Sequence, residues 1–172
     1  MFINTGLLRA VDNEAQLAGV MGHEMSHVIL RHGTNQASKS QLIELPALLG
    51  AQMTGSSMVE KLAQVGIGVG VLLRFARSAE SQADLMGSHL MAEAGYDPMQ
   101  LARFFDKLNT NGQQAPQFLS DHPNPENREK AIAMEVQRLP AQSYTYQSGE
   151  FQQMKQAIAK IHEKPVPPPH NQ

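Results

Sequence analysis

Three residues in one short stretch have the types and spacing that could bind a metal ion and activate water: His23, Glu24 and His27, in the pattern His-Glu-x-x-His. Residues four apart share a face of a helix, so both imidazoles could point at one ion. Glu24, about 100° further round the helix, could face the open side of that ion. Two nitrogen ligands beside a carboxylate base are typical of zinc peptidases. Because so short a motif also occurs by chance, the rest of the chain has to support it.

Catalytic zinc needs a third protein ligand, and a chain without cysteine can offer only His, Asp or Glu. Glu80 is well placed in the middle of a predicted helix, where the small side chains of 76–83 would let another helix approach closely. Its alternative role is that of a solvent-facing glutamate. Asp84 shares the face of Glu80. It could accept the second ring N–H of a metal-binding histidine, or it could be a surface carboxylate.

His122 precedes a proline, which favours an extended backbone, and it lies just before a predicted helix. From there it could donate to the oxyanion of a tetrahedral intermediate, or bind zinc as a fourth ligand. A purely structural role is the alternative. Arg128, in the following helix, could brace this loop or stabilise the developing charge.

The other histidines are interpreted as outside the site. His89 faces away from Glu80 on the same predicted helix and is expected to be packed or at the surface. His32 is expected in the last turn of the first long helix, with Gly33 as its C-cap, where it would interact with the helix dipole rather than a metal. His162 and His170 are interpreted as surface residues.

Apolar periodicity, caps and prolines predict a mainly α (α+β) domain. The start of the chain, 2–8, is interpreted as a strand of a small N-terminal sheet, and 143–146 as a possible short strand. Helices are expected at about 13–32, 34–49 with a kink near Pro46, 58–73, 74–93 ending at Gly95, 98–108, 125–138 and 148–162.

Composition limits the class of protein. The chain has 172 residues, 41% of them apolar and 17% charged, with a net charge of −2. This predicts one globular domain over 1–163 followed by a proline-rich tail at 164–172, and gives no reason to expect nucleic acid as a partner. The absence of cysteine excludes disulfides and thiol catalysis. Because a strand at the very start needs a partner, we expect a domain excised from a longer protein.

The apolar stretch around 58–73 has two interpretations. Its uncharged run from Leu62 to Leu73 is 12 residues long, whereas a membrane span needs about 20. A buried helix with close backbone contacts is one interpretation. The other is a surface that faces a membrane or a partner, so that 40–74 would be a flap over a cleft or a contact with the membrane or an envelope protein.

Together these motifs resemble those of the M48 zinc metallopeptidases, a gluzincin family, and most closely its soluble periplasmic members. The resemblance extends over residues 2 to about 136. It rests on His23-Glu24-x-x-His27, Glu80-x-x-x-Asp84, His122-Pro123 with Arg128, and the surrounding segments Asn4-Thr5-Gly6, Arg31-His32-Gly33 and Ala94-Gly95-Tyr96-Asp97-Pro98. The chain departs from the membrane-embedded members in having no complete transmembrane helix.

The resemblance implies a zincin-like domain that hydrolyses peptide bonds in proteins, in envelope protein quality control. It implies that one Zn²⁺ is bound by three residues: His23, His27 and Glu80. It implies catalytic roles for four more: Glu24 as general base, Asp84 in supporting the site, and His122 and Arg128 in assisting the transition state or latching the cleft.

Two hypotheses of other classes stay open. One is a zinc-bound chaperone or scaffold with latent proteolysis, in which His122 takes the fourth zinc position and 40–74 covers the cleft. The other is a helical binding module that carries the motif by coincidence and binds no metal. For the peptidase we expect a protein or peptide substrate and a periplasmic or cell-envelope location.

Overall fold

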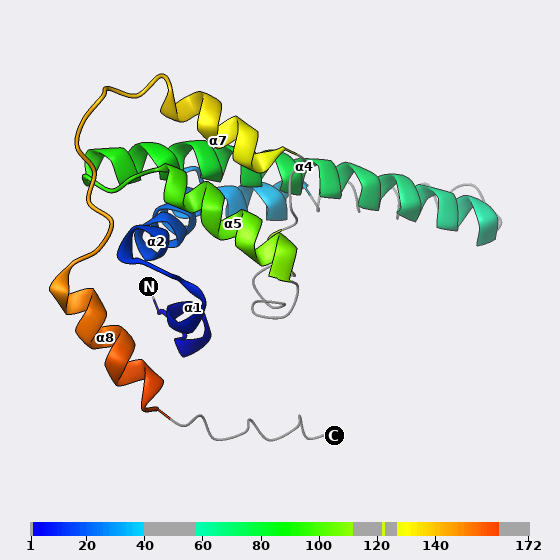
Figure 1. The fold of residues 1–172 in the computed structure, drawn as a ribbon. Coiled ribbons are helices and arrows are strands. Elements are labelled where there is room, and N and C mark those ends of the chain that lie inside the picture. Colours follow the sequence, from blue (N-terminus) through cyan, green and yellow to red (C-terminus); the bar gives the residue numbers. More distant parts are fainter. Residues whose placement is uncertain (1, 40–57, 112–121, 123–126, 162–172) are drawn as a thin grey trace.

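The computed structural model describes residues 2–39, 58–111, 122 and 127–161, without the side chains of 58–69, 71 and 111. The named elements in this part of the chain are all helices (Figure 1). They are α1 (Thr5–Ala10), α2 (Glu14–Ile29), α4 (Met58–Glu93), α5 (Met99–Asn111), α7 (Arg128–Val136) and α8 (Gly149–Ala159). Residues 32–39 are also helical and follow α2 after a short turn.

The predicted N-terminal sheet is wrong, because the chain begins with the helix α1. The side chain of Asn4 accepts a hydrogen bond from the backbone N–H of Leu7, at 2.7 Å, and so caps this helix. The sequence Asn-Thr-Gly is equally typical of a turn after a strand, which is why it was misread. Lys155 of α8 then donates to the backbone carbonyls of Leu8 (3.0 Å) and Val11 (2.7 Å), and satisfies the end of α1.

Among the described residues, the strand-like pairing consists of one isolated β-bridge. It joins Tyr96 to Thr145, whose N–H donates to the carbonyl of Gly95 at 2.8 Å. The short strand expected at 143–146 is reduced to this contact. Gly95 ends α4 with a φ of 82°, in agreement with the predicted glycine cap.

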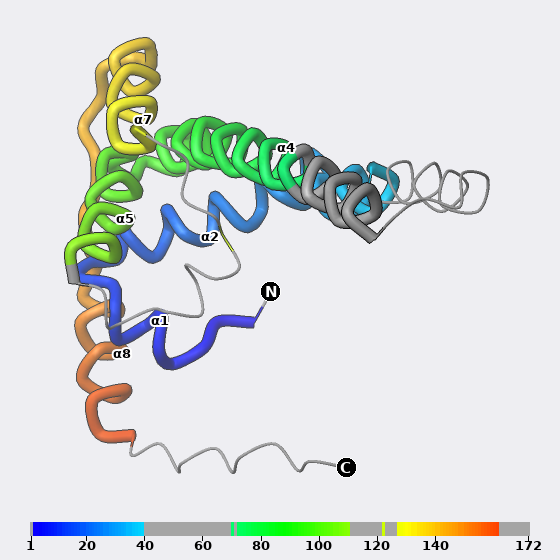
Figure 2. Tube along the Cα trace, turned by 90° about the vertical axis from the view of Figure 1, so that its right-hand side faces the viewer, coloured from blue at the N-terminus to red at the C-terminus, as the bar shows by residue number. Residues whose placement is uncertain are grey.

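The core lies where α2, α4, α5 and α7 meet (Figure 1). Figure 2 shows α2 running alongside α4, with α5 and α7 gathered at the same end of α4. The apolar stripe of α5 supplies much of the core, because helical spacing puts these residues on one face: Leu101, Phe104, Phe105 and Leu108. Burying these side chains is what holds the helices together.

The antiparallel packing of α2 on α4 depends on two glycines. A Cβ atom on Gly87 would lie 3.0 Å from the backbone nitrogen of His23, and one on Gly22 would lie 3.2 Å from the carbonyl oxygen of Gly87. The two backbones are therefore closer than larger residues allow. Ala83, one of the predicted small residues, is fully buried in the same helix. This packing sets His23 and His27 of α2 beside the middle of α4.

The helix α4 is continuous over 36 residues, whereas the sequence predicted a boundary near Arg74. Within the described residues, no helix is both long enough and apolar enough to cross a membrane. Three predictions lie wholly or partly outside the described residues: the 40–57 part of the flap predicted at 40–74, the second half of the helix expected at 34–49, and the tail at 164–172.

Candidate metal and catalytic site

The helix α2 positions the first three candidate residues. It is capped by Asn13, whose side chain accepts from the N–H of Gln16 at 2.9 Å. His23 is fully buried, and its ring packs edge-on against Phe105, with 5.6 Å between ring centroids. The core therefore fixes the orientation of His23, while Glu24 on the next position stays partly exposed.

Three candidate ligand atoms converge between α2 and α4. The Nε2 atoms of His23 and His27 are 3.0 Å apart. The carboxylate of Glu80 lies 3.2 Å from the first of these nitrogens and 3.4 Å from the second. Atoms bound to one tetrahedral zinc ion at 2.0–2.2 Å stand about 3.3–3.6 Å apart. The spacing and the N, N, O donor set thus fit a metal ion.

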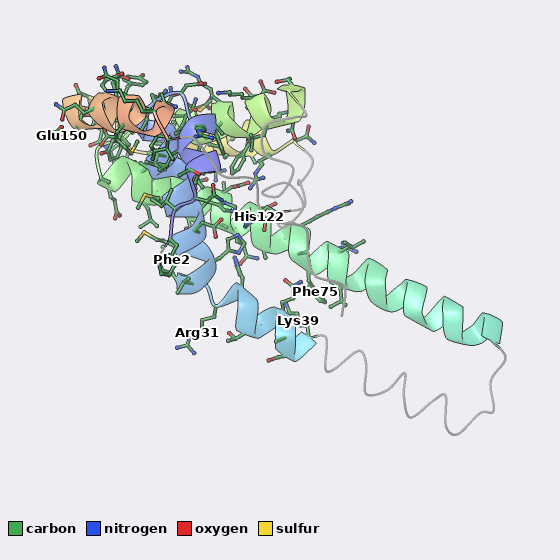
Figure 3. The ribbon with its side chains drawn as sticks, turned by 90° about the horizontal axis from the view of Figure 1, so that it is seen from below. Phe2, Arg31, Lys39, Phe75, His122 and Glu150 are labelled. Carbon is green, nitrogen blue, oxygen red and sulfur yellow. The ribbon has the colours of Figure 1, made fainter. Side chains whose placement is uncertain are left out.

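His122 joins this cluster from a distant part of the chain, and Figure 3 shows it beside α4. Its Nδ1 lies 3.1 Å from both carboxylate oxygens of Glu80 and 3.3 Å from Nε2 of His23. Its Nε2 lies 3.2 Å from Oε1 of Glu24. The candidate ligand atoms of His23, His27, Glu80 and His122 all lie within 4.8 Å of one another. His122 is therefore close enough to act on a molecule bound at this cluster.

Asp84 and Arg128 form a buried layer behind His23. Oδ1 of Asp84 lies 3.0 Å from Nδ1 of His23, which assigns a ring proton to Nδ1, so that Nε2, which faces the cluster, is the nitrogen that would bind a metal. Arg128 donates to Asp84 through Nε and Nη2, and its guanidinium carbon lies 3.4 Å above the ring of Phe105. This layer fixes the tautomer and the orientation of His23.

His32 has a place that the sequence interpretation missed. It is not in the last turn of the active-site helix, because α2 ends at Ile29. It is 8% exposed, and its Nδ1 lies 3.1 Å from Nδ1 of His27. The expected C-cap, Gly33, lies inside the 32–39 helix, so that prediction is also wrong. The segment Arg31-His32-Gly33 is part of the family resemblance, and it is the signal that could have indicated a role for His32 in the site.

Of the remaining three histidines, the structure describes one, His89. His89 points from α4 toward α7, where its Nε2 lies 2.7 Å from Oε1 of Glu135, and it is partly exposed. This agrees with the expectation that it lies outside the site. His162 and His170 lie outside the described residues.

The cluster has strongly shifted acid–base properties in the metal-free protein. Burial raises the pKa of Glu80, but hydrogen bonds with His122 and His23 outweigh it and hold this pKa well below its ordinary value. Burial also opposes the charge on His122, yet hydrogen bonds to Glu24 and Glu80 raise its pKa to about 9. Burial and then the nearby charge of His23 lower the pKa of His27 to about 4.

The pKa values of His23 and Glu24 shift in opposite directions. Burial lowers the pKa of His23, but hydrogen bonds to Asp84 and Glu80 raise it overall. Burial raises the pKa of Glu24, but the hydrogen bond from His122 and the neighbouring histidine charges bring it below its ordinary value. Glu24 is therefore a carboxylate at neutral pH, able to accept a proton.

Comparison with known proteins gives a consistent family. The sequence model of peptidase family M48 matches residues 1–136. The chain is 32% identical over 130 residues to a mitochondrial metalloendopeptidase OMA1 from Arabidopsis thaliana, covering 75% of this chain and 26% of the relative. It is 31% identical over 137 residues to a beta-barrel assembly-enhancing protease from Escherichia coli, covering 73% of this chain and 28% of the relative. The chain thus spans about a quarter of the length of these relatives.

Proposed function

Since the chain belongs to peptidase family M48, we propose that it is a zinc-dependent endopeptidase that hydrolyses peptide bonds in protein substrates. One observation carries the proposal: the ring nitrogens of His23 and His27 and the carboxylate of Glu80 converge within 3.0–3.4 Å of one another. Glu24 lies next to His23 on α2. The names of the relatives describe proteases, and nothing in the comparisons supports the chaperone or scaffold alternative.

We assign one zinc ion per chain to His23, His27 and Glu80. Bound there, zinc would supply Lewis acidity toward a substrate carbonyl and would lower the pKa of a bound water. The chain contributes two neutral imidazoles and one carboxylate, a donor set that suits catalytic zinc. The low pKa of Glu80 keeps its carboxylate available as a ligand at neutral pH.

Glu24 is the proposed general base. It does not belong to the set of atoms that converge on the metal position, and it is partly exposed, so a substrate and a water molecule could reach it. As a carboxylate at neutral pH it can take a proton from the attacking water and pass it to the leaving amine. A positioned acid–base group of this kind contributes about 10²–10⁴-fold to a rate.

His122 is the proposed donor to the oxyanion. Its ring lies between Glu24 and Glu80 and touches both carboxylates. Its raised pKa means that it carries its proton at neutral pH in the metal-free protein, so that it could donate to a developing negative charge. Asp84 and Arg128 act behind the cluster: Asp84 holds the ring of His23, and Arg128 holds Asp84.

The substrate class and the location follow from the relatives and are proposals for this chain. The Escherichia coli relative is named for its effect on beta-barrel assembly, and the Arabidopsis relative is mitochondrial. We infer protein substrates in the cell envelope, with a periplasmic location and a role in protein quality control. Contact with a membrane or envelope protein through 40–74 stays part of this proposal.

Metal content and cleavage of casein test the proposed function when measured together on the wild type and on Glu24→Gln. The wild type should bind about one zinc ion per chain and cleave casein. Glu24→Gln should keep the zinc and lose at least about 10²-fold in cleavage rate, because only the base is removed.

Glu93→Gln is the matched control, since Glu93 is exposed near the end of α4 and away from the cluster. It should keep both zinc and activity. A wild type that binds zinc but shows no Glu24-dependent cleavage would contradict the peptidase proposal.

A further inference from the structure

His32, which is not one of the candidate ligands, lies directly behind the metal-facing ring of His27. The two Nδ1 atoms are 3.1 Å apart, and the rings meet edge to face at 78°, with 4.9 Å between their centroids. His32 is 8% exposed, so solvent does not compete strongly for this contact. His32 contacts Nδ1 of His27, just as Asp84 contacts Nδ1 of His23.

The backbone at Arg31 delivers this ring. On an unbroken helix, five positions correspond to about 500°, so His32 would lie about 140° round from His27. Instead Arg31 adopts a φ of 55°, which ends α2 and starts a new helix at residue 32. The turn is held by Asn35, whose N–H donates to the carbonyl of Arg31 at 3.0 Å and whose side chain donates to that of Leu30 at 3.3 Å.

The direction of the His27–His32 hydrogen bond follows from the metal site. Nε2 of His27 faces Glu80 and His23, so it must be a bare lone pair when it binds a metal. A neutral His27 then carries its proton on Nδ1. Two bare nitrogens would repel at 3.1 Å, as would two N–H groups. His32 therefore accepts through Nδ1, and its own proton is on Nε2.

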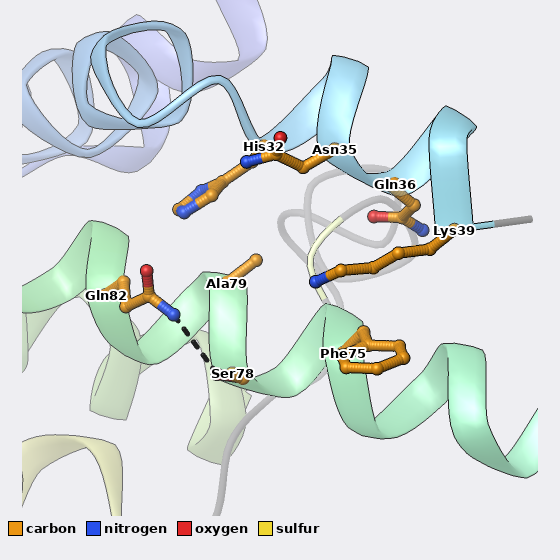
Figure 4. Close-up of a pocket in the computed structure, with 8 residues that line it drawn as sticks. All are labelled: His32, Asn35, Gln36, Lys39, Phe75, Ser78, Ala79 and Gln82. Atoms are coloured by element: carbon orange, nitrogen blue, oxygen red, sulfur yellow. Dashed lines mark hydrogen bonds between the residues drawn. The ribbon is translucent and has the colours of Figure 1, made fainter.

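No other hydrogen bond holds the His32 ring in the described part of the structure. Its Nε2 is buried and has no hydrogen-bond partner there. Figure 4 shows the ring reaching from the 32–39 helix toward α4, on the wall of a small polar pocket of about 70 Å³ that it shares with Gln82 and Lys39. A buried polar atom without a partner costs about 1–3 kcal/mol. The hydrogen bond with His27 is therefore the polar contact that the buried ring of His32 makes.

We propose that His32 is a positioning residue for the metal site, which accepts the Nδ1 proton of His27 and thereby fixes the tautomer and the ring angle that direct Nε2 at the ion. This inference rests on the proposed zinc site. It makes the two metal-binding histidines unequal: a carboxylate supports His23, whereas a neutral imidazole supports His27. Partners of this kind usually contribute 10–100-fold to metal affinity.

Zinc affinity by competition with a chromophoric chelator tests this role in His32→Leu, His32→Asn and the wild type. Leu removes the acceptor and keeps the bulk, while the side-chain oxygen of Asn stands where Nδ1 stood. Leu should weaken zinc binding about 10–100-fold, and Asn should restore most of the loss. His89→Leu, at a partly exposed histidine that pairs with Glu135, is the matched control and should bind zinc like the wild type.

Nitrogen-15 NMR of the zinc-loaded wild type gives a measurement that needs no variant to fold. His32 should show a proton on Nε2 and a bare Nδ1. A proton on Nδ1 of His32, or a cationic ring, would overturn the inference, as would equal losses of affinity in Leu and Asn. Zinc bound equally by the wild type and His32→Leu would overturn it while leaving the peptidase proposal intact. A wild type that binds no zinc would overturn both.

Discussion

Arg128 and Asp84 form a two-pronged ion pair in the interior: Nε of Arg128 donates to Oδ2 at 2.6 Å, and Nη2 donates to Oδ1 at 2.7 Å. Both side chains are almost fully buried. The pair joins α7 to α4, and through Oδ1 of Asp84 it extends to His23 of α2. One ion pair therefore ties the scaffold to the candidate metal site.

Asp84→Asn should destabilise the metal-free protein by about 3–5 kcal/mol, because it leaves the guanidinium of Arg128 buried without its main counter-charge. Urea unfolding in the presence of a chelator measures this. The control is Arg138→Gln, which removes the ion pair of Arg138 with Glu135, in which the arginine side chain is 71% exposed. An exposed pair contributes at most about 1 kcal/mol. Similar losses in the two variants would show that the Asp84–Arg128 pair does not stabilise the core.

Gly87→Ala should destabilise the protein by about 1–3 kcal/mol, because the new Cβ meets backbone rather than a flexible side chain. The displaced helices should also separate His23 from Asp84 and weaken zinc binding. Gly70→Ala in the same helix is the control, since a Cβ there meets nothing within 4 Å. It should be neutral or stabilise by up to about 1 kcal/mol through helix propensity. Urea unfolding and chelator competition read the two effects, and equal behaviour of the variants would contradict the close glycine contact.

The stability of the metal-free protein should be greatest near pH 6.5 among the pH values around neutrality. Folding lowers the pKa of His27 from 6.5 to about 4. The unfolded chain thus binds more protons below pH 6.5, and stability is lost as pH falls toward 4. Folding raises the pKa of His122 to about 9. The folded protein thus keeps a proton that the unfolded chain releases, and stability is lost as pH rises from 6.5 toward 9.

Urea unfolding with chelator at about pH 5, 6.5 and 8.5 measures this pH dependence. The raised pKa of His23 also lowers stability as pH rises above 6.5. His122→Gln should therefore flatten the alkaline decline without removing the acid one. A wild-type stability that increases between pH 6.5 and 8.5 would contradict the contacts of His122 with Glu24 and Glu80.

The sequence was sufficient where chemistry and spacing lie within one helix. His23 and His27 are four apart, as are Glu80 and Asp84, so helical periodicity alone places each pair on one face. The structure then brings the two pairs together. Their roles as metal ligands and supporting residue stay predictions.

The sequence was insufficient where a feature depends on a partner or on one backbone angle. Gly22 and Gly87 are unremarkable on their own helices and become necessary only when the two backbones meet. The start of the chain allowed either a turn or a helix cap at Asn4, and the cap formed. His32 was expected in the last turn of the helix that carries His27, because the left-handed conformation of Arg31 cannot be predicted from helical periodicity.

Arg31 is the residue on which the position of His32 depends, and its φ of 55° lies in the left-handed region. An L-residue pays about 1–2 kcal/mol there, and asparagine tolerates the region best after glycine. Its side chain projects away from α4 (Figure 3), so substitutions act mainly through the backbone. Arg31→Asn should leave stability equal or slightly higher and keep zinc affinity.

Arg31→Val should behave differently, because β-branched residues are strongly disfavoured in this conformation. We expect a loss of about 1–2 kcal/mol in urea unfolding, together with weaker zinc binding as His32 moves away from His27. Arg77→Val, at an exposed position inside α4, supplies the control, since it loses only about 0.5 kcal/mol of helix propensity. If Arg31→Val and Arg77→Val lost the same stability and both kept wild-type zinc affinity, the turn at Arg31 would not be what aims His32 at His27.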